Sequence, residues 1–312
     1  MQSLSPRGPG ALFAHLRRPM RLLLLAMVLM YAMFLQIPFL NLKDGLRNKP
    51  FMAALLVTNF VLIPLLVWGL TRFLEGHPAI LIGVLLVLLT PCIDYVVVFT
   101  HIGRGDSRLI LSATPILLLL QFALLPLYLG LMLSDTSGVV VSVGPFVEAF
   151  LALIVAPLIL ALLTEVLVKR SAAVKTWAEA WAWLPVPAMA AVLIAVVGSQ
   201  IAPVVSEIDR LAPVLPVYIA FAFLAPVIGA LISKAFKLPV RSARAVTFSS
   251  STRNSLVVLP LALALPEELR GLAAAAVITQ TLVELVAELV YVRAVPAFLC
   301  RDRAGTSKPL ND

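Results

Sequence analysis

The chain has 312 residues, of which 61% are hydrophobic and 13% are charged, and its net charge is +8. Soluble globular proteins have a charged share of about 25%, so this composition excludes that class. Apolar runs of 18 residues or more recur along the chain and are continuous rather than alternating, which is typical of helical membrane spans and not of a membrane barrel.

The hydrophobic pattern predicts an all-α polytopic membrane protein with about nine transmembrane helices. A tail at residues 1–20 precedes them and a tail at 293–312 follows the transmembrane region 21–292. The predicted spans are 21–40, 50–72, 79–101, 109–132, 144–168, 184–204, 212–234, 243–265 and 270–292.

The basic residues lie mainly between the apolar runs, which indicates orienting loops rather than a nucleic-acid surface. They concentrate in the loops at 41–49, 102–108, 169–183 and 235–242 and in the C-terminal tail. The positive-inside rule therefore places the C-terminus in the cytoplasm, and nine spans then place the N-terminus outside. Arg17 and Arg18 argue against that position of the N-terminus. The expected location is the plasma (inner) membrane.

The third apolar run contains a proline, a thiol and a carboxylate within four residues, Pro91, Cys92 and Asp94. Proline removes a backbone donor and clashes with the preceding turn, so the helix is expected to break at Pro91. A carboxylate at that depth must face protein or a water-filled cavity.

The eighth apolar run has the same character. Its polar segment at 249–255 places Arg253 in the membrane, and the helix is expected to break at Ser250, Ser251 and Thr252. An odd number of connections separates the two broken spans, so the halves would be inverted repeats. Two such spans, one in each half, are typical of the binding site of a secondary transporter.

Several side chains near the breaks are candidates for the solute site and for ion coupling. The predicted solute-binding residues are Cys92, Asp94, Arg253, Asn254 and Ser255, and the predicted proton-carrying residues are Asp94 and Glu284. Glu288, which shares a helical face with Glu284, is expected to be interfacial. We expect Asp94 and Arg253 to pair, either as a coupling device that switches or as a permanent structural link.

Alternatives remain for these residues. Cys92 is either a soft ligand for a trivalent metalloid or a small buried hydrophobe. The serines either line a cavity or only satisfy unwound backbone. No metal-ligand cluster, Walker A loop or catalytic constellation is apparent, so we expect no cofactor, no resident metal and no enzymatic activity. The expected partners are a small solute and the lipid bilayer.

The stretch TPCIDYVVVFTHIGRGD at 90–106 resembles the bile acid:sodium symporter superfamily, and in particular its arsenical-resistance arsenite efflux transporters. The resemblance implies a panel domain (21–40, 144–168 and 184–204) and a core domain (50–132 and 212–292). It also implies that Cys92 is the essential thiol. Sodium-coupled relatives carry a Ser-Asn pair where this chain has Val96 and Val97, so no sodium site is expected.

The function predicted from these observations is secondary active transport by alternating access around the two broken helices. The resemblance favours proton-coupled efflux of arsenite or a related metalloid. Arg253 favours a small organic anion instead. A less favoured alternative is a membrane sensor that does not transport.

Overall fold

A computed structural model describes residues 27–28, 30–32, 34–35, 47–74, 76–133, 148, 150–168, 170–182 and 208–301. Within these residues every regular element is a helix. The chain divides into two compact units, Met1–Ile37 with Val143–Leu193 and Pro38–Ser142 with Ile194–Asp312. The finer division into a panel and a core stays a prediction.

The second unit begins with one continuous span, Lys49–Leu74, where the sequence predicts 50–72. Asn48 caps its first turn, because its Oδ1 accepts a hydrogen bond from the backbone N of Phe51 at 3.2 Å. The middle of the span has π-helical geometry, which often accompanies functional sites. In order, its segments are α3 (Lys49–Val57), the π segment η2 (Thr58–Leu62), α4 (Ile63–Thr71) and η3 (Arg72–Leu74).

The third predicted span is broken, as its proline indicates. It consists of α5 (Pro78–Leu88), an irregular link and α6 (Val96–Ile102). The next span, α7 (Ser107–Leu133), continues through two internal prolines.

The C-terminal half of this unit follows the same order of an unbroken span, a broken span and a further span. The unbroken span is α13 (Val214–Ala235), which follows the short α12 (Ile208–Leu211). The broken span is α14 (Val240–Ser251) and α15 (Ser255–Leu263), and the last span is α16 (Glu267–Ala294), extended by the π segment η5 (Val295–Leu299).

The described part of the first unit contains η4 (Leu151–Val155), α9 (Ala156–Val168) and α10 (Ala172–Ala182). Tyr31 and Thr164 are hydrogen-bonded through their hydroxyls at 2.9 Å, which ties the first predicted span to α9. The predicted span 184–204 and the tail at 1–20 lie outside the described residues, as does the C-terminal tail beyond Arg301.

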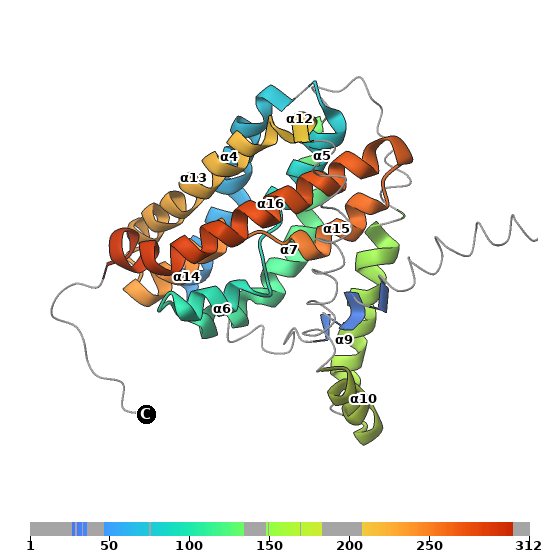
Figure 1. Cartoon of the computed structure of the whole chain (residues 1–312). Coiled ribbons are helices and arrows are strands. Elements are labelled where there is room, and N and C mark those ends of the chain that lie inside the picture. Colours follow the sequence, from blue (N-terminus) through green and yellow to red (C-terminus); the bar gives the residue numbers. More distant parts are fainter. Residues whose placement is uncertain are drawn as a thin grey trace, which may run out of the picture. The chain divides into compact units, whose positions relative to one another are not determined.

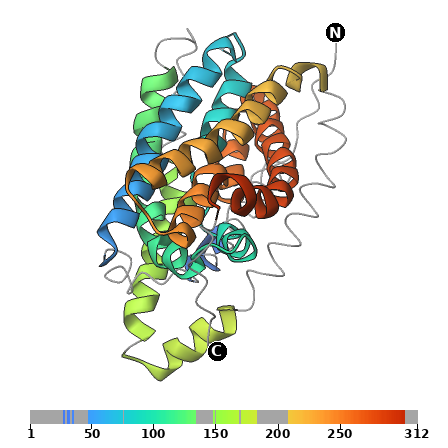
Figure 2. The same cartoon turned by 90° about the vertical axis from the view of Figure 1, so that its left-hand side faces the viewer.

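The core of the second unit forms around α16. This helix packs along α5 and α15, while α13 and α14 form a tightly packed hairpin (Figures 1 and 2). The approach of α5 to α16 requires a glycine, since a Cβ at Gly83 would lie 2.8 Å from the Cα of Ala273.

Four helical stretches of the described chain are long and apolar enough to cross a membrane: Lys49–Leu74, Ser107–Leu133, Leu151–Val168 and Val214–Ala235. Their outward faces carry large exposed apolar side chains, such as Leu131 and Phe223. Such faces are expected against lipid. The predicted all-α polytopic membrane architecture, with two broken crossing helices, is confirmed.

Candidate functional site

The two broken helices cross and pair through their unwound backbones. The backbone N of Cys92 donates to the carbonyl of Thr252 at 3.0 Å, and the backbone N of Asn254 donates to the carbonyl of Thr90 at 2.9 Å. These bonds form an antiparallel bridge between Pro91 and Arg253. Each break thus satisfies polar groups that the other exposes, which makes non-helical backbone tolerable inside a membrane protein.

Side-chain hydroxyls donate back to backbone carbonyls near the end of each first half-helix. At the end of α5, Thr90 donates to the carbonyl of Leu86 at 2.9 Å. At the end of α14, Ser251 donates to the carbonyl of Thr247 at 3.0 Å. The Oδ1 of Asn254 then caps α15. Part of the serine and threonine content of the second break therefore satisfies backbone, one of the two alternatives for these residues.

The guanidinium of Arg253 fills a cage of protein oxygens. Its side chain is fully buried. Its Nη2 donates to the carbonyls of Ser249 and Ser250, both at 2.7 Å, and to Asn59 Oδ1 at 2.9 Å. Its Nη1 donates to the carbonyl of Leu88 at 3.3 Å. We call these four oxygens the oxygen cage.

Electrostatics explains why the cage holds a cation. The carbonyls of Ser249 and Ser250 belong to the last turn of α14, and that of Leu88 ends α5. The C-terminal end of a helix carries a partial negative charge, and two such ends converge on Arg253. The ring of Phe221 adds a cation–π contact, with its centroid 5.5 Å from Cζ.

The predicted ion pair between Asp94 and Arg253 does not form in this conformation. The Nη atoms of Arg253 are committed to the oxygen cage, and Asp94 Oδ2 is buried without a hydrogen-bond partner. Two helix ends and a side-chain amide supply partners for both Nη atoms without the carboxylate, while Nε has no hydrogen-bond partner.

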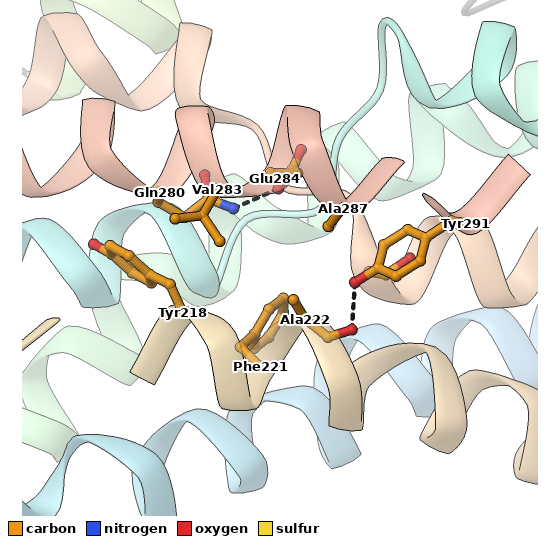
Figure 3. A pocket seen from close by; sticks show the side chains of 9 residues that line it. Tyr218, Phe221, Ala222, Gln280, Val283, Glu284, Ala287 and Tyr291 are labelled. Carbon is orange, nitrogen blue, oxygen red and sulfur yellow. Dashed lines mark hydrogen bonds between the residues drawn. The ribbon is translucent and has the colours of Figure 1, made fainter. Parts of the chain in front are cut away.

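Glu284 connects both breaks to α16. Its Oε2 accepts a hydrogen bond from the backbone N of Arg253 at 2.9 Å and another from Gln280 Nε2 (Figure 3). Its Oε1 lies 2.7 Å from Tyr95 Oη, and the same Oη lies 2.8 Å from the carbonyl of Arg253. One carboxyl group therefore contacts residues of both broken spans.

The expectation that Glu288 is interfacial is wrong. Its side chain is fully buried, and its Oε1 lies 2.6 Å from Thr252 Oγ1. Helical spacing places Glu288 one turn after Glu284 on the same face, and that face of α16 points at the second break.

A small cavity adjoins Glu284 between α13 and α16. Its volume is about 10 Å³, which is room for about one water molecule. Tyr218 and Phe221 on α13 face Gln280 and Glu284 across it, and Tyr291 closes one end by donating to the carbonyl of Ala222 (Figure 3).

The remaining predicted solute residues also lie at the crossing and are buried. Cys92 is a free thiol that is fully buried within the first break. Asn254 caps α15 and Ser255 is its first residue, and Asn254 Nδ2 has no hydrogen-bond partner. The crossing thus offers a thiol, an unpaired acceptor on Asp94 and an unpaired donor on Asn254. Within the described segments, no three His, Cys, Asp or Glu residues gather into a metal site.

Two residues of the site were not singled out from the sequence. Asn59 lies in η2 and is buried, and its position as a polar residue in an apolar span was an available signal. Tyr95 belongs to the sequence motif of the first break, but nothing local to it indicates that its hydroxyl reaches α16.

The comparisons with known proteins point to a transporter family. The model of the sodium bile acid symporter family matches residues 22–207, more than half of the chain. The match includes the first break, whereas the second break lies beyond it. No curated protein matches the chain at a significant level. The chain therefore belongs to the sodium bile acid symporter family, a family of membrane transporters.

Proposed function

We propose that this membrane transporter is sodium-independent and proton-coupled, and that its solute binds where the two broken spans cross. The observation that carries the proposal is the oxygen cage filled by Arg253. Alternating access around the crossing would expose the solute to each side of the membrane in turn.

What occupies the oxygen cage supports sodium independence. Carbonyl and amide oxygens are the ligands that hard cations prefer. Here those oxygens surround a covalently attached cation, which supplies the positive charge at the crossing permanently. Val96 and Val97 offer no side-chain oxygen that would build a separate sodium site.

Proton coupling is supported by the position of Glu284. Its carboxyl group contacts Tyr95 of the first break and the backbone of Arg253 in the second. Gaining or losing a proton there changes the hydrogen bonds to both breaks at once. A coupling ion must have this kind of differential effect on two conformations.

Among solutes, the site favours a neutral metalloid oxyacid such as arsenite. Trivalent arsenic prefers soft thiolate ligands, and Cys92 places one thiol at the crossing. The hydroxyls of arsenite would pair with the free acceptor of Asp94 and the free donor of Asn254. A single thiol suits a carrier, since it binds a soft oxyacid weakly enough to release it.

A small organic anion is the second candidate solute. Arg253 Nε is buried without a hydrogen-bond partner and is a donor to which a carboxylate would bind. The other guanidinium nitrogens are already bound to the oxygen cage, which places this candidate second.

Arsenite resistance tests the proposal in cells that lack their own exporter. Cells with the wild-type protein should tolerate arsenite and accumulate less of it, and Cys92→Ser should abolish the protection. Cys300→Ser is the matched control, because Cys300 is the other cysteine of the chain and lies after η5. Absence of protection by the wild-type protein at matched expression would reject arsenite and leave the organic anion.

A further inference from the structure

The Tyr95 hydroxyl has two close oxygen neighbours but only one hydrogen to share between them. A tyrosine hydroxyl carries one hydrogen, and a backbone carbonyl only accepts. Tyr95 Oη lies 2.8 Å from the carbonyl of Arg253 and 2.7 Å from Glu284 Oε1. If Glu284 were ionised, one of these short oxygen–oxygen contacts would contain no hydrogen.

A proton on Glu284 supplies the hydrogen that the second contact needs. Its acid O–H, on Oε1, donates to Tyr95 Oη, and Tyr95 donates to the carbonyl of Arg253. The other oxygen, Oε2, keeps its role as acceptor from the backbone N of Arg253 and from Gln280. Every contact of the carboxyl group then has one donor and one acceptor.

The same shortage of a hydrogen occurs where Thr252 meets Glu288, one helical turn after Glu284 on α16. Its Oγ1 lies 2.6 Å from the carbonyl of Phe248 and 2.6 Å from Glu288 Oε1. The threonine hydroxyl has one hydrogen for these two oxygens, so an acid proton on Glu288 is needed here as well. Glu288 Oε2 has no hydrogen-bond partner, and a neutral acid leaves that oxygen far less costly to bury than an ionised carboxylate does.

We propose that Glu288, paired with Thr252, is a second proton-binding site, and that Glu284 and Glu288 are both protonated in this conformation. The inference rests on the proposed proton coupling and adds a second coupling residue on α16. Together the two acids hold the second break against the last span.

Loss of these protons would release the break. Each acid O–H bond would break and its proton would pass to water. The cavity of about 10 Å³ has room for one water molecule and is lined by Glu284 and, next to Glu288 on α16, by Ala287 and Tyr291. The hydroxyl hydrogens would then turn toward the carboxylates and leave the carbonyls of Arg253 and Phe248. Two carboxylates one helical turn apart would also repel each other.

Several elements that pack against α16 contribute ionisable groups that face Glu284 and Glu288. The first break contributes a thiol and a phenol, the second break a guanidinium, α13 a phenol, and α16 a further phenol: Cys92, Tyr95, Arg253, Tyr218 and Tyr291. The guanidinium is the one cation in this set, and its Nη atoms are bound to the oxygen cage rather than to either glutamate.

Infrared spectroscopy of the purified protein in lipid vesicles tests protonation without any solute. Buried carboxylic acids give a carbonyl stretching band that ionised carboxylates lack. The wild-type protein should show this band at neutral pH, and Glu284→Gln and Glu288→Gln should each remove a separate component. Glu267→Gln, at an exposed position, should remove none. Absence of the band in the wild type, or a band unchanged by Glu288→Gln, would overturn the inference.

Transport measurements test the coupling role, with arsenite as the probe in vesicles. A pH gradient should drive accumulation by the wild type, and Glu288→Gln should lose the drive while still exchanging arsenite across the membrane. The Gln amide can donate to Thr252 as the acid does, so the break stays held. Loss of the drive only in Glu284→Gln would overturn the second site. No response of the wild type to the pH gradient would instead reject the proposed proton coupling, and the infrared band would show whether the two protons are still bound.

Discussion

At the scale of single residues, Arg253 determines the character of the site. An arginine inside a membrane protein is costly unless it is paired or lines a cavity. Here its partners are neutral oxygens rather than an acid, and the ends of two half-helices provide most of them. The guanidinium of Arg253 therefore stabilises the second break, and we expect this break to be less stable without it.

Replacing Arg253 should therefore lower the stability of the protein. Arg253→Ala leaves the buried oxygens of the cage without donors, at a cost of about 1–3 kcal/mol for each unsatisfied group. We expect a lower thermal unfolding midpoint in detergent and loss of transport. Low concentrations of guanidinium ion should partly restore the midpoint, because the free cation can enter the vacated cage.

Two controls make this rescue specific. Urea has a similar shape without the charge and should not restore the midpoint. Arg270→Ala removes an arginine that forms a surface pair with Glu267 at 2.9 Å, and it should change little. An unchanged midpoint in Arg253→Ala would contradict the structural role of the cage.

At the scale of elements, the sequence predicted where the helices break but not what they contact. Pro91 interrupts an apolar run, and the hydroxyl-rich segment ending at Thr252 interrupts another, so both breaks are visible as local composition. Their antiparallel pairing depends on tertiary packing. The contacts of Arg253 involve residues nearly two hundred positions away, such as Asn59, and no local pattern encodes them.

The error at Glu288 has a similar origin. Its spacing from Glu284 correctly places both on one face of α16, but depth along the helix alone suggested the interface. The structure shows that this part of α16 continues alongside the second break, so the side chain is buried against Thr252.

The contact between α5 and α16 gives a prediction about helix packing. Gly83→Ala would place a Cβ 2.8 Å from the Cα of Ala273, a backbone atom that cannot rotate away. Overpacking of this kind costs about 1–3 kcal/mol, so we expect a lower unfolding midpoint and reduced transport. Gly130→Ala in α7 is the matched control, because the Cβ of an alanine there would meet no atom within 4 Å. Equal midpoints for the two variants would show that α5 and α16 do not pack this closely.

At the scale of the whole molecule, two basic loops and the start of the C-terminal tail meet at one end of the second unit. The backbone N of Asp106 donates to the carbonyl of Arg241 at 3.0 Å, which joins the loops at 102–108 and 235–242. Arg244 links the start of the C-terminal tail to the first of these loops. Its Nε donates to the carbonyl of Cys300 at 3.0 Å, and its Nη1 donates to the carbonyl of Arg104 at 3.2 Å. Three of the five basic segments that the charge pattern assigns to one side of the membrane therefore lie together.

This arrangement makes the orientation of the protein testable. Because short basic loops stay in the cytoplasm, the end defined by Arg104, Arg241 and Cys300 should be cytoplasmic, and the C-terminus with it. A fluorescent-protein fusion after the C-terminus should fluoresce, whereas an alkaline phosphatase fusion at the same place should be inactive. Fusions in the opposite connection, near Gly76, should give the reverse pattern. Active phosphatase at the C-terminus would place the basic end outside, and the direction of transport deduced from vesicle experiments would then have to be inverted.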